Sequence, residues 1–153
     1  MKRYLIALLI GSQATAPVVL AGALRARVQN ERFAIVTSIR GLPLGVRDGL
    51  QTLFESHTLD IAEPGADFQA SDSIVNPGLP TRRLVAAGCS YDSCIVYYQL
   101  GGTARTWRVA LFSWTPAETR FEWGGIAPGG LASIEEVRKA MLSGSIKGPA
   151  SSW

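Results

Sequence analysis

The chain has 153 residues, 47% hydrophobic and 18% charged, which is enough apolar material for one folded domain and excludes a disordered or low-complexity chain. The formal net charge of +3 includes Lys2 and Arg3; without them, 13 basic residues face 12 acidic ones and the remaining body carries +1. A nearly neutral body offers no electrostatic footprint for nucleic acid, so nucleic acid is not expected as a partner.

The N-terminus has the pattern of an export leader. Lys2 and Arg3 precede the unbroken apolar run 4–10, and the small residues of Ala21-Gly22-Ala23 suit cleavage by a signal peptidase. A second site of this kind, Ala14-Thr15-Ala16, is followed directly by a proline, which fits poorly in a protease cleft. The pattern therefore favours a cut after residue 23.

We predict a signal peptide over residues 1–23 and a single α+β domain over residues 24–153, located in the periplasm or secreted. A retained inner-membrane anchor stays open as an alternative, because residues 4–23 are about long enough to span a bilayer. A third alternative is that the apolar run is a buried helix of a cytosolic protein. In the first two cases the body lies outside the cytoplasm, and it would contact a membrane only through residues 4–23 if they are not cleaved.

The first elements of the body are a strand and a helix. Residues 24–32 form a polar lead-in, flexible or helical, and the β-branched residues of 33–39 predict a strand. Apolar residues at helical spacing predict a helix over residues 43–55, although Gly45 and Gly49 lower its helical propensity. The apolar stripe of this helix consists of Val46, Leu50, Leu53 and Phe54.

The clearest pattern is an antiparallel meander over residues 83–114. Its predicted strands are Arg83–Cys89, Cys94–Leu100 and Thr106–Trp114. The preceding segment 56–80 is loop-like, with room for a short edge strand at 68–75. Cys89 and Cys94 fall opposite each other in neighbouring strands, so an exported chain is expected to join them in a structural disulfide.

The turns of the meander predict a register. A two-residue turn at Gly101-Gly102 places Arg108 opposite Ile95, and the pairing of Cys89 with Cys94 places Ala87 opposite Val96. One face of the sheet then forms a core that the helices cover, leaving a mixed face on the other side. The predicted core face consists of Val85, Ala87, Cys89, Cys94, Val96, Tyr98, Trp107, Val109 and Leu111.

The last part of the chain carries a fourth strand and a second helix. Residues 121–123 predict the strand, and 124–130 a glycine-rich link. The helix spans 133–143 and begins with a capping box of Ser133 and Glu136. The polar tail after this helix is expected to be loose, although the Trp153 side chain could dock back onto the domain.

Together these elements predict the α+β class. The expected fold is a three- to five-stranded, mainly antiparallel sheet built around the meander 83–114, with two helices at about 43–55 and 133–143.

Residues suited to catalysis or metal binding are scarce. His57 is the only histidine and lies near Glu55 and Asp60, so it is a weak candidate for acid–base work in a small hydrolase. A histidine at the end of a helix more often interacts only with the helix dipole. One histidine and two paired cysteines leave no metal set, and the glycine runs lack a nucleotide fingerprint, so no cofactor is expected.

The strongest candidate for binding is a patch on the mixed face of the sheet. In the predicted register Arg108 is framed by Ile95, Tyr97 and Phe112, and an arginine among aromatic residues is typical of a recognition surface. We therefore expect a non-enzymatic exported domain that binds a protein or an envelope component. The alternatives are a membrane-tethered accessory subunit of an envelope complex and a small hydrolase using His57.

Overall fold

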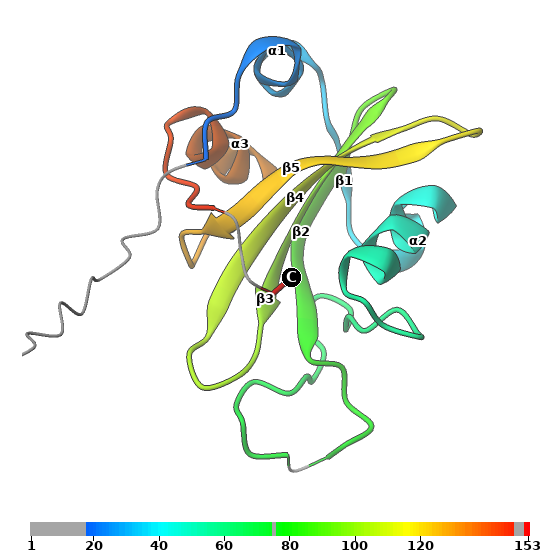
Figure 1. Ribbon diagram of the computed structural model, residues 1–153, viewed down its shortest axis with the longest axis vertical. Coiled ribbons are helices and arrows are strands. Elements are labelled where there is room, and N and C mark those ends of the chain that lie inside the picture. Colours follow the sequence, from blue (N-terminus) through cyan, green and yellow to red (C-terminus); the bar gives the residue numbers. More distant parts are fainter. Residues whose placement is uncertain (1–17, 75, 149–151) are drawn as a thin grey trace, which may run out of the picture.

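The computed structural model describes residues 18–74, 76–148 and 152–153. It contains one five-stranded antiparallel sheet in the order β1-β2-β3-β4-β5 and three α-helices, which confirms the predicted α+β class (Figure 1). The elements in chain order are α1 (Gly22–Asn30), β1 (Ala34–Val36), the 3-10 helix η1 (Ile39–Gly41), α2 (Leu44–Leu53), β2 (Arg82–Cys89), β3 (Ser93–Leu100), β4 (Thr106–Trp114), β5 (Thr119–Ala127) and α3 (Ile134–Leu142).

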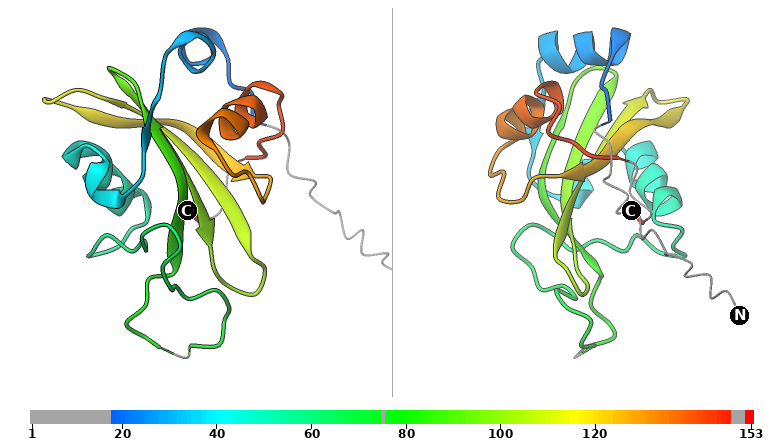
Figure 2. Two further views of the ribbon diagram at one scale, coloured as in Figure 1. Left: turned by 180° about the vertical axis from the view of Figure 1, so that it is seen from behind. Right: turned by 60° about the vertical axis from the view of Figure 1, so that its left-hand side comes forward.

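Each face of the sheet has its own core. α1 and α3 lie on one side of the sheet and α2 on the other, as the right view of Figure 2 shows. The prediction that the helices cover one side only is therefore wrong. The physical reason is in β3: residues 94–98 are all buried, and such a continuous apolar run suits a strand that is covered on both faces.

The two cores are named here by the helix that covers them. The α3-side core includes Leu20, Val28, Ile95, Tyr97, Val109, Leu111, Trp123, Ile134, Val137 and Met141. The α2-side core includes Val46, Leu50, Phe54, Leu84, Cys94, Val96, Tyr98, Ala110 and Phe112.

The predicted register of β2 against β3 is correct at the disulfide end. Cys89 pairs with Cys94 and Ala87 with Val96, and the Cys89–Cys94 disulfide is present. Further along β2 the register shifts between Leu84 and Ala86. This bulge turns Val85 toward the α3-side core, away from the predicted face.

The predicted register of β3 against β4 is wrong. Leu100 pairs with Thr106 instead of Thr103, so Arg108 lies opposite Tyr98 and not opposite Ile95. This shift of three positions exchanges the two faces of β4, because side chains alternate along a strand. Gly101 does not serve a two-residue turn; it allows a close contact with the loop before β2, where a Cβ atom would lie 1.6 Å from the main-chain oxygen of Gln69.

β5 is longer than the predicted strand 121–123 and includes Gly124 and Gly125, which the sequence assigns to a link. Both glycines accommodate neighbours from the end of the chain. A Cβ atom at Gly125 would lie 3.0 Å from a methyl carbon of Ile146, and one at Gly124 would lie 3.1 Å from the indole of Trp153. The glycines therefore permit close packing on both faces of the strand.

Two other predicted strands are reduced. Of residues 33–39, only Ala34–Val36 pairs with β2, and η1 follows. Within the described part of the predicted edge strand, residues 68–74, no strand is present. The tail is also less loose than expected, because Lys147 forms a bridge with Ile126 at the free edge of β5.

The two predicted helices are confirmed, with their ends shifted by about one or two residues. In α3 the Ser133 hydroxyl accepts a hydrogen bond from the Glu136 amide at 3.2 Å, which is one half of the predicted capping box. The Glu136 carboxylate accepts from the Ala132 amide, one residue before Ser133. In α2 the glycines allow the helix to lie close to the sheet. A Cβ atom at Gly45 would lie 2.1 Å from Thr119 Oγ1, and one at Gly49 would lie 2.9 Å from the ring of Phe112.

The described chain begins inside the predicted leader. The Val18 amide donates to the Ile146 carbonyl at 3.0 Å, and Leu20 is buried in the α3-side core. α1 starts at Gly22, so a cut after Ala23 would fall inside this helix and remove two residues that contact the domain. Residues 1–17 lie outside the described residues, and the predicted cleavage stays a prediction.

Among the helices of the described segments, none combines the length and the apolarity needed to cross a bilayer.

We predict that Leu20→Ala lowers the free energy of unfolding by about 3 kcal/mol, because it removes a leucine side chain from a packed core. Val19→Ala is the matched control, since Val19 is 76% exposed, and it should change stability by less than about 0.5 kcal/mol. Urea denaturation of the chain from Pro17 onward measures both. Equal stability of the two variants would show that this segment does not belong to the folded domain.

Candidate functional site

Three polar side chains lie together on the α2 side of the sheet, and we call them the arginine face: Arg82 on β2, Tyr98 on β3 and Arg108 on β4. Tyr98 pairs directly with Arg108, and Arg82 lies on the same side of the neighbouring strand. All three are buried: Tyr98 is 0% exposed, Arg108 5% and Arg82 9%. Two buried guanidinium groups on one face of a small sheet are unusual, because removing a charge from water is costly.

Arg82 is surrounded by partners. Its Nη1 donates to Asp60 Oδ2 at 2.6 Å, and its Nε donates to the main-chain oxygen of Trp153 at 2.8 Å. The guanidinium carbon lies 4.1 Å from the centre of the Phe54 ring, in a cation–π contact. Burial lowers the pKa of Arg82, and the negative charge of Asp60 opposes this effect.

Arg108 has only neutral partners among the residues that the structure describes. Its Nε donates to the Ser152 carbonyl at 3.0 Å, and its Nη1 donates to the Trp107 carbonyl at 3.3 Å. Burial lowers the pKa of Arg108, and the nearby charge of Arg82 lowers it further. A guanidinium nevertheless keeps its charge in proteins. Arg108 is therefore a buried cation that bonds to main-chain carbonyls and to no side-chain carboxylate among the described residues.

The Tyr98 hydroxyl completes the arginine face. Its ring packs edge-on against Phe54, with 5.3 Å between the ring centres. The hydroxyl is buried beside the Arg82 guanidinium, and no acceptor for its proton lies within the described residues. Burial raises the pKa of Tyr98, whereas the charges of Arg82 and Arg108 lower it. The hydroxyl is therefore a neutral donor with unused hydrogen-bonding capacity between two positive charges.

The last two residues of the chain lie against this face. Figure 1 shows the C-terminus in front of the sheet, and the right view of Figure 2 places it on the side of α2. The main-chain oxygens of Ser152 and Trp153 accept from the two arginines. The Trp153 indole contacts Phe121 edge-on, with 5.0 Å between ring centres. It also packs against the backbone of Gly124, in the space that a side chain at that position would need.

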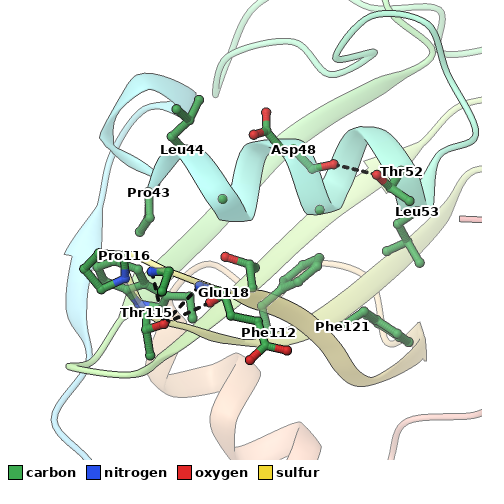
Figure 3. Close-up of a pocket in the computed structure, with 15 residues that line it drawn as sticks. Pro43, Leu44, Asp48, Thr52, Leu53, Phe112, Thr115, Pro116, Glu118 and Phe121 are labelled. Atoms are coloured by element: carbon green, nitrogen blue, oxygen red, sulfur yellow. Dashed lines mark hydrogen bonds between the residues drawn. The ribbon is translucent and has the colours of Figure 1, made fainter.

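An apolar groove adjoins this site. It lies between α2 and the turn joining β4 to β5 and has a volume of about 610 Å³. Phe121 is common to both regions, since it lines the groove and also contacts Trp153. The carboxylate of Asp48 points away from the groove floor in Figure 3, and Phe112 forms part of that floor.

The structure separates the four predicted binding residues. Arg108 and Phe112 lie on the α2 side, whereas Ile95 and Tyr97 belong to the α3-side core. The Tyr97 hydroxyl donates to the Pro128 carbonyl at 2.7 Å, and Tyr97 lies on the side of the sheet opposite to the arginine face. The single patch expected from the sequence does not form, because the five-residue connection between β3 and β4 changes the register.

His57 lies after the end of α2, and its side chain is exposed. Its main-chain oxygen accepts from the Gln51 side chain at 2.9 Å. Asp60, its expected carboxylate partner, instead binds Arg82 and the Thr81 amide. His57 does not line the groove between α2 and the β4–β5 turn, nor three smaller pockets formed by described residues.

Metal binding finds no support in the described residues, because no three His, Cys, Asp or Glu side chains come together there.

Sequence reasoning missed Arg82, Asp60 and Phe54 as members of a site. Arg82 immediately precedes the predicted meander, two positions before Leu84, so its place on the same face as a core residue is a detectable signal. Its partners carry no such signal: Asp60 lies in the long loop after α2, and Trp153 comes from the end of the chain.

No protein-family model matches the chain, and comparisons with curated proteins and with solved structures find no match either. The functional interpretation therefore depends on the geometry of the arginine face.

We predict that Asp60→Asn lowers the free energy of unfolding by about 2 kcal/mol, because the guanidinium of Arg82 loses its charged partner while it stays largely buried. Asp67→Asn is the matched control: Asp67 is exposed in the same loop and should tolerate the change. Thermal and urea denaturation measure both variants. Equal stability of Asp60→Asn and the unmodified chain would mean that the ion pair does not support the fold.

Proposed function

We propose that this chain is an exported, non-enzymatic domain whose arginine face binds a ligand that carries a carboxylate. The observation that carries the proposal is the set of partners around Arg108. Arg82 is bonded to the Asp60 carboxylate and to the main-chain oxygen of Trp153, whereas the bonded partners of Arg108 among the described residues are main-chain carbonyls. A carboxylate placed beside Tyr98 would accept from both guanidinium groups and from the hydroxyl.

The chemistry of these groups supports binding more than catalysis. A guanidinium does not lose its positive charge near neutral pH, and burial raises the pKa of Tyr98, so its hydroxyl stays protonated. General acid–base work needs a group whose pKa lies near the working pH. The arginine face thus offers fixed donors that hold an anion and orient it.

Export is supported by the leader pattern and by the disulfide. Lys2 and Arg3 with the following apolar run are typical of a signal peptide, and a Cys89–Cys94 bond persists in an oxidising compartment. Because Val18 and Leu20 contact the domain, we propose that they stay with the mature chain. A retained leader or a cut after Ala16 fulfils this condition.

The test of the binding function uses N-acetyltryptophan, which offers a carboxylate and an indole, and its uncharged amide as the matched probe. We expect the acid to shift the NMR resonances of the arginine face and to bind at least about tenfold more tightly than the amide. Arg108→Gln should weaken binding of the acid by a similar factor. Arg105→Gln, at an exposed position before β4, is the control and should bind like the unmodified chain.

Equal binding of the acid and the amide, or full binding by Arg108→Gln, would contradict the proposal.

A further inference from the structure

We infer that Ser152 and Trp153 occupy the arginine face as an internal competitor, and that the external partner is an extended peptide segment with an aromatic residue and a carboxylate. This inference rests on the proposed function and adds to it the class of partner and the means of control. It is argued from the two described tail residues and the side chains that hold them.

The tail shows which main-chain atoms the site accepts. The carbonyl of Ser152 accepts from Arg108 at 3.0 Å, and the next main-chain oxygen along the chain, that of Trp153, accepts from Arg82 at 2.8 Å. Two consecutive main-chain oxygens are thus received by side chains from two different strands. A peptide segment presents successive carbonyls of this kind along its backbone.

The site also has a place for one aromatic side chain. The Trp153 indole lies over the bare backbone of Gly124, where a Cβ atom would come within 3.1 Å of it, and the edge-on contact with Phe121 fixes its orientation. Phe121 is itself 40% exposed, so this place opens to solvent at one side. An incoming aromatic residue can therefore approach the position that Trp153 fills.

The tail is a poor electrostatic match for the site it fills. It gives Arg108 a neutral carbonyl, and the Tyr98 hydroxyl finds no acceptor for its proton among the described residues. Hydrogen bonds from a guanidinium to a carboxylate are stronger than those to a neutral oxygen, so a partner segment with a carboxylate gains an interaction that the carbonyl of Ser152 does not supply.

Tethering explains how a weak occupant can still regulate the site. A segment joined to its site by a short connection acts at an effective concentration on the order of millimolar. A free peptide with the same contacts is therefore largely excluded at micromolar concentration. A partner must bind more strongly than the tail, and weakening the tail should raise the apparent affinity of every ligand of this site.

The test supplies the tail in trans to the full chain. A fluorescein-labelled peptide of residues Lys147–Trp153 is titrated with the unmodified chain and with Trp153→Ala, and binding is followed by anisotropy. We expect Trp153→Ala to bind the peptide at least tenfold more tightly than the unmodified chain does, because its own tail competes less. The same peptide with alanine in place of tryptophan should bind poorly, because it lacks the indole that packs on Gly124 and Phe121.

Two further measurements make the outcomes decisive. Combining Trp153→Ala with Arg108→Gln should abolish the tighter binding of the labelled peptide. Combining Trp153→Ala with Arg105→Gln should preserve the tighter binding. Size-exclusion chromatography should show a monomer, because exchange of tails between two copies would produce a dimer and would overturn the internal assignment. Circular dichroism confirms that each variant is folded.

The two proposals fail in different ways. If N-acetyltryptophan binds in an Arg108-dependent manner but Trp153→Ala binds the peptide no better than the unmodified chain, the tail is not a competitor and only the inference falls. If neither probe depends on Arg108, the proposed function falls as well.

Discussion

The burial of two guanidinium groups side by side on one face of the sheet is the constraint on which the rest of the site depends. Arg82 and Arg108 project from β2 and β4 onto the α2 side, with Tyr98 between them. Each group must receive partners inside a small domain, because an unpaired buried charge is strongly destabilising. Asp60, Phe54 and the end of the chain are all brought to this place.

The partners are distributed unevenly between the two arginines. Arg82 has a carboxylate and an aromatic ring, which are the interactions that make a buried cation acceptable. Arg108 has only main-chain carbonyls within the described chain. A fold selected for stability alone would do as well with an apolar residue at position 108, since apolar replacements of buried charges are often neutral or stabilising. This unevenness is the reason to assign Arg108 a role in binding.

The two-sided sheet gives the site its rigidity. The α3-side core, sealed by α1 and α3, fixes the strands from behind, and the disulfide joins β2 to β3 at one end. The arginine side chains therefore project from strands that cannot move independently. A preorganised charged surface of this kind loses little conformational freedom when a ligand binds.

Local patterns in the sequence predicted much of this framework. The disulfide, the meander strands, both amphipathic helices and the capping box of Ser133 depend on residues that are close in the chain, and the structure confirms them. The register of β4 and the extent of β5 were not predictable in this way. They depend on the packing of Gly101 against Gln69 and of Gly124 against Trp153, which are contacts between distant segments.

The candidate site was only partly predictable for the same reason. Arg108 stands out in the sequence as a charge within an apolar strand, but its choice as a binding residue depended on the predicted register, which framed it with aromatic residues. Its neighbours were assigned from a register that was wrong by three positions. Ile95 and Tyr97 were therefore placed on the same face as Arg108, although they lie on the opposite face of the sheet. Asp60 and Trp153 reach the site through long-range contacts that no periodicity encodes.

The central claim, that both arginines are buried and held by fixed acceptors, is tested most directly by the NMR signals of the arginine Nε protons in the full chain. The account predicts that the Nε protons of Arg82 and Arg108 have chemical shifts outside the narrow range of solvent-exposed arginines. It also predicts that they exchange with solvent at least about tenfold more slowly than those of the exposed Arg105 and Arg120. Exchange of all four at the same rate would contradict it.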